Sequence, residues 1–282
     1  MSPDDQASKL RELMRTSRGT RTIAVASGKG GVGKSNVALN LSILLSAAGH
    51  RVALVDADLG LANLDVLTDV MVRANLSHVV GGKRSLEEIV VDLPSGVQLV
   101  PGASGLARLA SLSDFQRAKL LRDLAALEAD NDVIVVDCSA GIGPDMLAFA
   151  CGADHVIVIA TPEPTAITDA YAVIKSLMQK RYGGYVSLLA NMVAGRHEAR
   201  STHQRIATVA RQFLGARVFD AGYVLTDPRV PEAVRRREPF VLAFPRSPAS
   251  RCLAALATKL RSGSAMVGPK EGFFRRVANW FA

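Results

Sequence analysis

The sequence predicts an α/β fold built on a doubly wound, mostly parallel sheet. Three observations lead to that prediction. Between residues 21 and 260, short apolar runs typical of buried strands alternate with segments of helical periodicity. A glycine-rich loop follows the first apolar run and opens the first helix. Acidic residues stand directly after two later apolar runs, where ligands of such sheets collect.

Length and composition suit one such domain with short extensions. The chain has 282 residues, of which 49% are hydrophobic, so it can bury a full core. Its net charge of +8 favours an anionic partner, such as a nucleotide, a nucleic acid or an anionic lipid. Three widely spaced cysteines without a Cys-x-x-Cys pair suit a reducing cytosol. The sequence shows neither an apolar run long enough to span a membrane nor a signal core, which predicts a cytoplasmic protein.

The glycine-rich loop fits the phosphate-binding pattern, in which glycine and four further residues precede Gly-Lys-Ser/Thr. An apolar run at 22–26 precedes the loop, and a helical pattern at 36–45 follows it. Together they direct backbone N–H groups and a helix N-terminus at an anion. We expect Lys34 to reach the β- and γ-phosphates and the Ser35 hydroxyl to bind Mg²⁺. The residues predicted to bind the nucleotide here are Gly28, Lys29, Gly30, Gly31, Val32, Gly33, Lys34, Ser35 and Asn36.

Two later strands deliver carboxylates to the same place. The run 51–55 ends at Asp56 and Asp58, and the run 132–136 ends at Asp137. Because the carboxyl ends of parallel strands meet at one edge, these groups should lie beside the nucleotide. Asp56 and Asp137 are predicted in the water shell of Mg²⁺, and Asp58 is predicted to hold the attacking water. The alternative is that one aspartate simply caps the next helix.

The rest of the chain continues the alternation. A strand is predicted at 97–100, a helix at 114–128 capped by Asp114, and strands at 155–160, 185–190 and 218–223. Further helices are predicted after Thr165, which is expected to be the cap, and over 198–213, 231–237 and 246–260. Residues 70–95 are predicted to form short helical pieces. Asn191 follows one of these strands, and its amide can pair with both a donor and an acceptor of adenine. The alternative for Asn191 is a plain turn residue.

The last residues form an amphipathic pattern after a linker at 261–268. As a helix, the segment gathers its large apolar side chains on or beside one face: Phe273, Phe274, Val277, Trp280 and Phe281. Arg275 and Arg276 are expected on the opposite face. Aromatic side chains opposite arginines suit the interface of an anionic bilayer, so the segment is predicted to bind membrane. The alternative is a tail helix docked on its own domain.

These motifs resemble those of the MinD/ParA family, P-loop NTPases of the SIMIBI class with a deviant Walker A loop. Lys29, the second lysine of the loop, matches the family's signature lysine. The resemblance implies an ATP-dependent homodimer in which Lys29 contacts the nucleotide of the partner subunit. It also implies that Asp58 is the catalytic carboxylate, that residues 138–143 form switch II, and that Asn191 reads adenine.

Within that family the chain resembles the FlhG (FleN/YlxH) flagellar-number ATPases. The similarity rests on Asp-Gln-Ala-x-x-Leu-Arg at 5–11, on 59–65, on Pro-Glu-Pro-Thr-Ala at 162–166, and on the C-terminal segment. It implies a slow Mg-ATP-dependent switch that binds membrane as an ATP dimer, leaves as an ADP monomer and controls flagellar number and placement. The implied partners are an FlhF-like GTPase, the anionic inner face of the cell membrane, and flagellar switch proteins or a transcriptional regulator.

This interpretation divides the chain into a partner-activating segment, 1–20, an ATPase domain, 21–262, and a linker with a membrane helix, 263–282. Two other classes remain as alternatives. A ParA-type partition ATPase would bind DNA through arginines such as those at 235–237. Nucleic acid is the less favoured partner, because a solvated face is the default interpretation of that arginine run. A small-molecule kinase or ligase would use the same loop, but Lys29 and the amphipathic tail argue against it.

Overall fold

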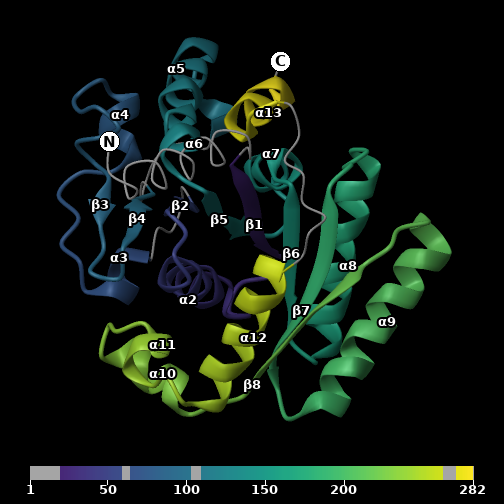
Figure 1. The fold of residues 1–282 in the computed structure, drawn as a ribbon. Helices are drawn as coiled ribbons and strands as arrows, with labels where there is room; N and C mark the ends of the chain where they lie inside the picture. Colours follow the sequence, from purple (N-terminus) through teal and green to yellow (C-terminus); the bar gives the residue numbers. More distant parts are fainter. Residues whose placement is uncertain (1–19, 59–63, 103–108, 263–270, 282) are drawn as a thin grey trace, which may run out of the picture.

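The computed structural model describes residues 20–58, 64–102, 109–262 and 271–281. Its strands form one 8-stranded sheet in the order β3-β4-β2-β5-β1-β6-β7-β8. Every neighbouring pair is parallel except β3 and β4. Helices cover both faces of this sheet (Figure 1). The predicted doubly wound α/β fold is therefore confirmed.

The strands are β1 Arg21–Ser27, β2 Val52–Ala57, β3 Val91–Asp92, β4 Val97–Val100, β5 Val133–Ala140, β6 His155–Ala160, β7 Tyr185–Val193 and β8 Phe219–Leu225. The central strands are buried on both faces, which is why they appear in the sequence as continuous apolar runs. The sequence analysis missed β3, because a strand of two residues has no recognisable periodicity. It lies at the edge of the sheet, antiparallel to β4.

The helices are α2 Lys34–Ala47, α3 Leu64–Thr68, α4 Leu76–Val80, α5 Asp114–Ala125, α6 Leu127–Asp130, α7 Pro144–Gly152, α8 Pro164–Gln179, α9 Arg196–Leu214, α10 Arg229–Arg235, α11 Phe240–Ala243, α12 Pro248–Ser262 and α13 Phe273–Trp280, with a 3₁₀ turn at Leu109–Ser111. Two predicted caps are wrong. Ser113, not Asp114, caps α5 in a reciprocal pair with Gln116. Thr165 lies inside α8, because Pro164 already takes the first helical position.

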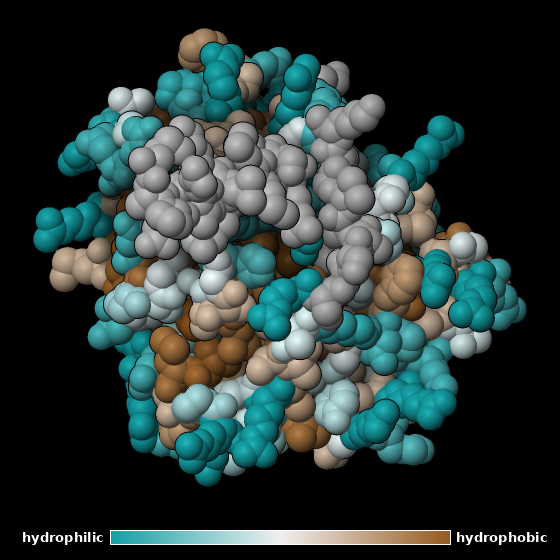
Figure 2. Space-filling model, viewed as in Figure 1, coloured by the Kyte–Doolittle hydropathy of each residue, from teal (hydrophilic) through white to brown (hydrophobic). Residues whose placement is uncertain are grey.

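Two hydrophobic cores lie on opposite faces of the sheet. One joins the sheet to α2, α11 and α12, and the other joins it to α5, α7, α8 and α13. On the face seen in Figure 2, apolar side chains gather over the corner where α11 approaches α2. Among the helices in the described ranges, none combines the length and apolarity that a membrane crossing requires.

Candidate functional site

The glycine-rich loop connects the end of β1 to the start of α2, as predicted. Gly33 has a φ of 86°, in the left-handed region that favours glycine. A Cβ atom at Gly33 would lie 2.4 Å from Nδ2 of Asn191, and one at Gly28 would lie 2.2 Å from the carbonyl oxygen of Asp169. These glycines therefore let the loop pass close to β7 and α8. The result places the N-terminus of α2, a natural anion site, at the carboxyl edge of the sheet.

A buried ion pair joins the loop lysine to the end of β5. Nζ of Lys34 donates to Oδ1 of Asp137 at 2.6 Å, and the two side chains are only 8% and 2% exposed. The Ser35 hydroxyl lies 3.4 Å from the same Nζ. The structure thus brings together three residues that the sequence analysis assigned to phosphate and Mg²⁺ binding.

Asp56 adds a second buried carboxylate beside this pair. Burial, together with the charge of Asp137, raises the pKa of Asp56 to about 7. A hydrogen bond of 3.1 Å from the backbone N–H of Asp58 lowers this pKa and so opposes part of the rise. Burial also raises the pKa of Asp137, while Lys34 opposes that rise. Two buried carboxylates share one lysine here, so an added cation would stabilise their charged forms.

The donor set fits Mg²⁺. Ser35, Asp56 and Asp137 offer a hydroxyl and two carboxylates, the hard oxygen ligands that Mg²⁺ prefers. Within the described residues, no group of three or more His, Cys, Asp and Glu side chains is placed to hold a metal. Mg²⁺ at nucleotide sites usually keeps several waters and takes phosphate oxygens, so few protein ligands are needed.

The protein without ligands is expected to lose stability as the pH rises from about 4 to 7. In this range Asp56 keeps its proton in the folded chain, whereas in the unfolded chain its pKa is near 3.8 and the proton has been released. Above pH 7 Asp56 is ionised in both states and contributes a constant penalty. Urea unfolding of wild-type and Asp56→Asn across this range measures the effect. The stability gain from Asp56→Asn should grow toward pH 7, and a gain that is independent of pH would contradict the assignment.

Asp58 lies just beyond the end of β2 and is half-buried. Its charge contributes to the raised pKa of Asp137, so the two carboxylates are close enough to interact. This position suits a carboxylate that faces a water near the γ-phosphate, and the catalytic role of Asp58 stays a prediction. Residues 59–63 of the following stretch, 59–65, which carries part of the family resemblance, lie outside the described residues.

Lys29 lies on the outer side of the loop and contacts its own chain. Its Nζ lies 2.5 Å from Oε2 of Glu163 and 3.2 Å from Oγ1 of Thr165, at the start of α8. The sequence analysis missed these partners, because they are more than 130 residues away in the chain. Exposed ion pairs contribute only about 0–1 kcal/mol, so Lys29 can exchange Glu163 for another anion at little cost.

An apolar cavity of about 600 Å³ adjoins the loop. It is bounded by the start of α2, the end of β7 and the β8–α10 connection, and its lining includes Asn36, Asn191, Met192, Pro228, Pro231 and Phe240. Asn191 is buried, and its Nδ2 donates to the carbonyl oxygen of Val32 at 2.7 Å. The cavity has the size and polarity that suit a nucleotide base.

The predicted Asn191 therefore lies in the cavity, but the sequence analysis missed its wall from β8 and α10. A usable signal existed, since Asp227-Pro228 follows a strand at the same carboxyl edge. Arg235 also lines this cavity, Arg236 pairs with Glu232, and Arg237 lies 3.6 Å from Asp69. The arginine run considered for DNA is thus partly engaged within the chain.

The predicted membrane helix, α13, is docked on its own domain. Phe273, Phe274 and Val277 are at most 1% exposed and pack against α5 and α7. Oε1 of Glu128 accepts a hydrogen bond of 2.9 Å from the backbone N–H of Phe274, which satisfies a donor in the first turn of α13. In Figure 1 this helix lies at the opposite end of the molecule from α10, which borders the base cavity.

Polar contacts complete the docked state. Nη2 of Arg276 lies 2.7 Å from Oδ1 of the buried Asp154. The expectation that Arg276 lies opposite the apolar face is therefore wrong, because this arginine sits at the edge of that face and reaches inward. Trp280 and Phe281 are half-buried, each beneath a cation. Nζ of Lys180 lies 4.9 Å from the centroid of the Trp280 ring, and Cζ of Arg117 lies 4.8 Å from that of Phe281. Arg275 is exposed, as expected.

Comparison with known proteins gives consistent results. A family profile described as the CobQ/CobB/MinD/ParA nucleotide binding domain matches residues 23–240. The antiactivator FleN of Pseudomonas aeruginosa is 38% identical over 91% of this chain and 93% of its own length. The flagellum site-determining protein YlxH of Helicobacter pylori is 35% identical over 98% of this chain and 99% of its own. The solved structure of MinD from Pyrococcus horikoshii, complexed with Mg-ADP, has a TM-score of 0.71 at 24% identity, covering 88% of this chain and 99% of that one.

Proposed function

This chain belongs to the CobQ/CobB/MinD/ParA nucleotide-binding family and, within it, to the FleN/YlxH (FlhG) group, and on that basis we propose that it is a slow Mg-ATP-dependent switch that cycles on the membrane. The observation that carries the proposal is the convergence of Lys34, Ser35, Asp56 and Asp137 beside the base cavity. A phosphate-binding loop, an oxygen donor set and an apolar slot at one edge of a sheet suit a nucleoside triphosphate.

The chain's own residues define the chemistry. Lys34, held at the phosphate end of the site, neutralises charge on the β- and γ-phosphates. Asp58 orients a water for in-line attack on the γ-phosphate. Ser35, Asp56 and Asp137 would hold Mg²⁺, which would supply further charge neutralisation when bound. Asn191 and the β8–α10 wall hold the base.

Lys29 connects hydrolysis to dimerisation. Its ammonium group lies at the surface in a weak ion pair with Glu163, so a second subunit can present a stronger anion, its bound triphosphate. In the proposed dimer, Lys29 leaves Glu163 and contacts the partner's nucleotide. ATP then joins two subunits, and hydrolysis with phosphate release separates them.

Membrane attachment requires α13 to leave its docking site, because its apolar face cannot be buried against α5 and α7 and in lipid at the same time. We infer that the ATP dimer favours the released helix and that two released helices bind anionic lipid far better than one. FleN is named an antiactivator and YlxH a flagellum site-determining protein. On those names we propose that the cycle controls flagellar number and placement, with flagellar switch proteins or a transcriptional regulator as further partners.

Co-sedimentation of the full-length protein with anionic liposomes tests the cycle. We expect retention with ATP and release with ADP. Lys29→Ala should bind nucleotide normally but remain monomeric and unbound to liposomes, as followed by light scattering alongside sedimentation. Equal retention with both nucleotides would refute the cycle. Retention of Lys29→Ala with ATP would refute only the role given to Lys29 and would leave the cycle intact.

Residues 1–20 are proposed to stimulate an FlhF-like GTPase, on the strength of the Asp-Gln-Ala-x-x-Leu-Arg motif at 5–11. Residues 1–19 of this segment lie outside the described residues. Removing residues 1–19 should abolish stimulation of FlhF GTP hydrolysis while leaving ATP-dependent liposome binding intact. Phosphate release by FlhF, measured with the full and the shortened chain, decides between stimulation by this segment and stimulation by the folded domain.

A further inference from the structure

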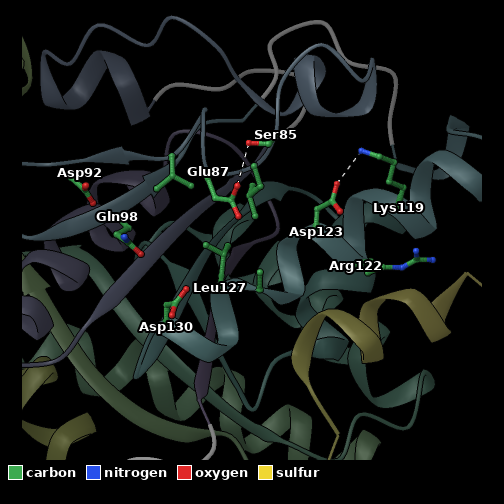
Figure 3. Close-up of a pocket in the computed structure, with 12 residues that line it drawn as sticks. Ser85, Glu87, Asp92, Gln98, Lys119, Arg122, Asp123, Leu127 and Asp130 are labelled. Carbon is green, nitrogen blue, oxygen red and sulfur yellow. Dashed lines mark hydrogen bonds and ion pairs between the residues drawn. The ribbon is translucent and has the colours of Figure 1, made fainter. Parts of the chain in front are cut away.

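A groove distinct from the nucleotide site lies between the α4–β3 segment and the α5–α6 segment (Figure 3). Its volume is about 610 Å³. Leu86, Val90 and Leu127 give it an apolar floor. Gln98 of β4 and Asp92 of β3 place it at the edge of the sheet.

The wall of this groove is anionic, although the chain as a whole carries a net charge of +8. Its carboxylates are Glu87, Asp92, Asp123 and Asp130. Asp123 pairs with Lys119 at 3.1 Å. Across the described ranges, no ion pair engages the other three. Arg122 also borders the groove, but its side chain points away from Asp130 in Figure 3.

The described chain starts at this wall. The hydroxyl of Thr20 hydrogen-bonds with the carbonyl oxygens of Glu128 and Asn131, around the end of α6. The same short helix contributes Leu127 and Asp130 to the groove. Thr20 therefore tethers residues 1–19 next to the groove, and the effective concentration of that segment there is in the millimolar range.

The tethered segment matches the groove chemically. Residues 9–18 contain four basic side chains, Lys9, Arg11, Arg15 and Arg18, and one acidic side chain. Leu10, Leu13 and Met14 interrupt the basic residues at helical spacing. We propose that residues 9–18 of the same chain occupy the groove, with apolar side chains on the Leu86–Val90–Leu127 floor and basic side chains on Glu87, Asp92 and Asp130.

This proposal goes beyond the switch cycle, because it gives the N-terminal segment a resting site on its own domain. A partner that binds the segment must then compete with the groove. The apparent affinity of such a partner is lowered by the fraction of chains in which the segment is docked.

Zero-length carbodiimide cross-linking of the full-length protein tests the docking, with unlabelled and ¹⁵N-labelled chains mixed in equal amounts. We expect the Lys9 amine to couple to Glu87, Asp92 or Asp130 within one chain. Couplings only between labelled and unlabelled chains would assign the groove to a second copy and overturn the proposal. Absence of any coupling to these three residues would overturn it as well.

Limited trypsin cleavage of full-length variants gives an independent measurement. Asp130→Lys turns an attraction into a repulsion and should speed cleavage after Arg11 and Arg15 by about three- to tenfold, a change of about 0.7–1.4 kcal/mol. Glu238→Lys, an equal charge change at an exposed site outside the groove, should leave the rates as in wild-type. Equal rates in all three proteins would overturn the proposal. Because the folded domain is intact in each, the outcome is independent of ATP-dependent dimerisation.

Discussion

Asp58→Asn is expected to slow ATP hydrolysis by about 10²–10⁴-fold, the usual contribution of a positioned acid–base group. Asp58 lies just past the end of β2, where it is half-buried, and its charge influences Asp137. Lys34 and Asp137, which contact each other, are left untouched. Nucleotide affinity should therefore remain close to that of wild-type.

The variant should also change where the protein resides. With hydrolysis blocked, the ATP dimer has no route back to the monomer, so Asp58→Asn should accumulate on anionic liposomes with ATP. Single-turnover phosphate release and co-sedimentation measure the two effects. Asp220→Asn is a suitable control, because Oδ1 of that exposed carboxylate accepts a hydrogen bond of 2.8 Å from the backbone N–H of Gly222 in β8 and has no assigned role. Wild-type turnover by Asp58→Asn would remove it from the mechanism.

The phosphate end of the site could be predicted from the sequence because each of its residues belongs to a local pattern. Gly33, Lys34 and Ser35 are consecutive, and Asp56 and Asp137 each follow an apolar run. The strand-end rule for parallel sheets then brings these separate runs to one edge. The ion pair of 2.6 Å between Lys34 and Asp137 shows that these two separate runs are in direct contact, as the rule predicts.

The way in which the walls of the base cavity come together and the partner of Lys29 do not follow from a local pattern. The cavity wall combines Asn191 with Pro228 and Phe240, whose approach depends on how β8, α10 and α11 pack. Glu163 meets Lys29 only because α8 starts beside the loop. Such contacts depend on the packing of distant elements, which a linear pattern does not contain.

The C-terminal helix shows a different limit of sequence analysis. Phe273, Phe274 and Val277 form an apolar face that satisfies a bilayer and a protein groove equally well. Amphipathicity predicted the helix, and the structure shows the docked arrangement. Arg276 is specific to the docked arrangement, since its ion pair with the buried Asp154 forms only while the helix lies on its own domain. The two environments then compete for one face, and the balance between them is open to mutation.

Gly152→Ala should shift that balance toward the released helix. Gly152 is the last residue of α7, and an added Cβ would lie 2.6 Å from Cγ2 of Val277 and 3.1 Å from the Phe273 ring. Overpacking of this kind costs about 1–3 kcal/mol. Alanine is itself favoured over glycine in a helix, so α7 should keep its own stability. The strain therefore falls on docking of α13.

We expect Gly152→Ala to bind anionic liposomes with ADP, where wild-type does not, with an apparent affinity raised by about 5- to 150-fold from the cost of overpacking. Gly183→Ala is the matched control, because an added Cβ there meets nothing within 4 Å. Ending the chain at residue 262 in the Gly152→Ala background should abolish the gain, since the gain requires α13. If Gly152→Ala stays unbound with ADP while hydrogen exchange shows α13 released, then this helix is not the membrane anchor. If exchange shows α13 still docked, the packing against Gly152 is softer than its geometry indicates.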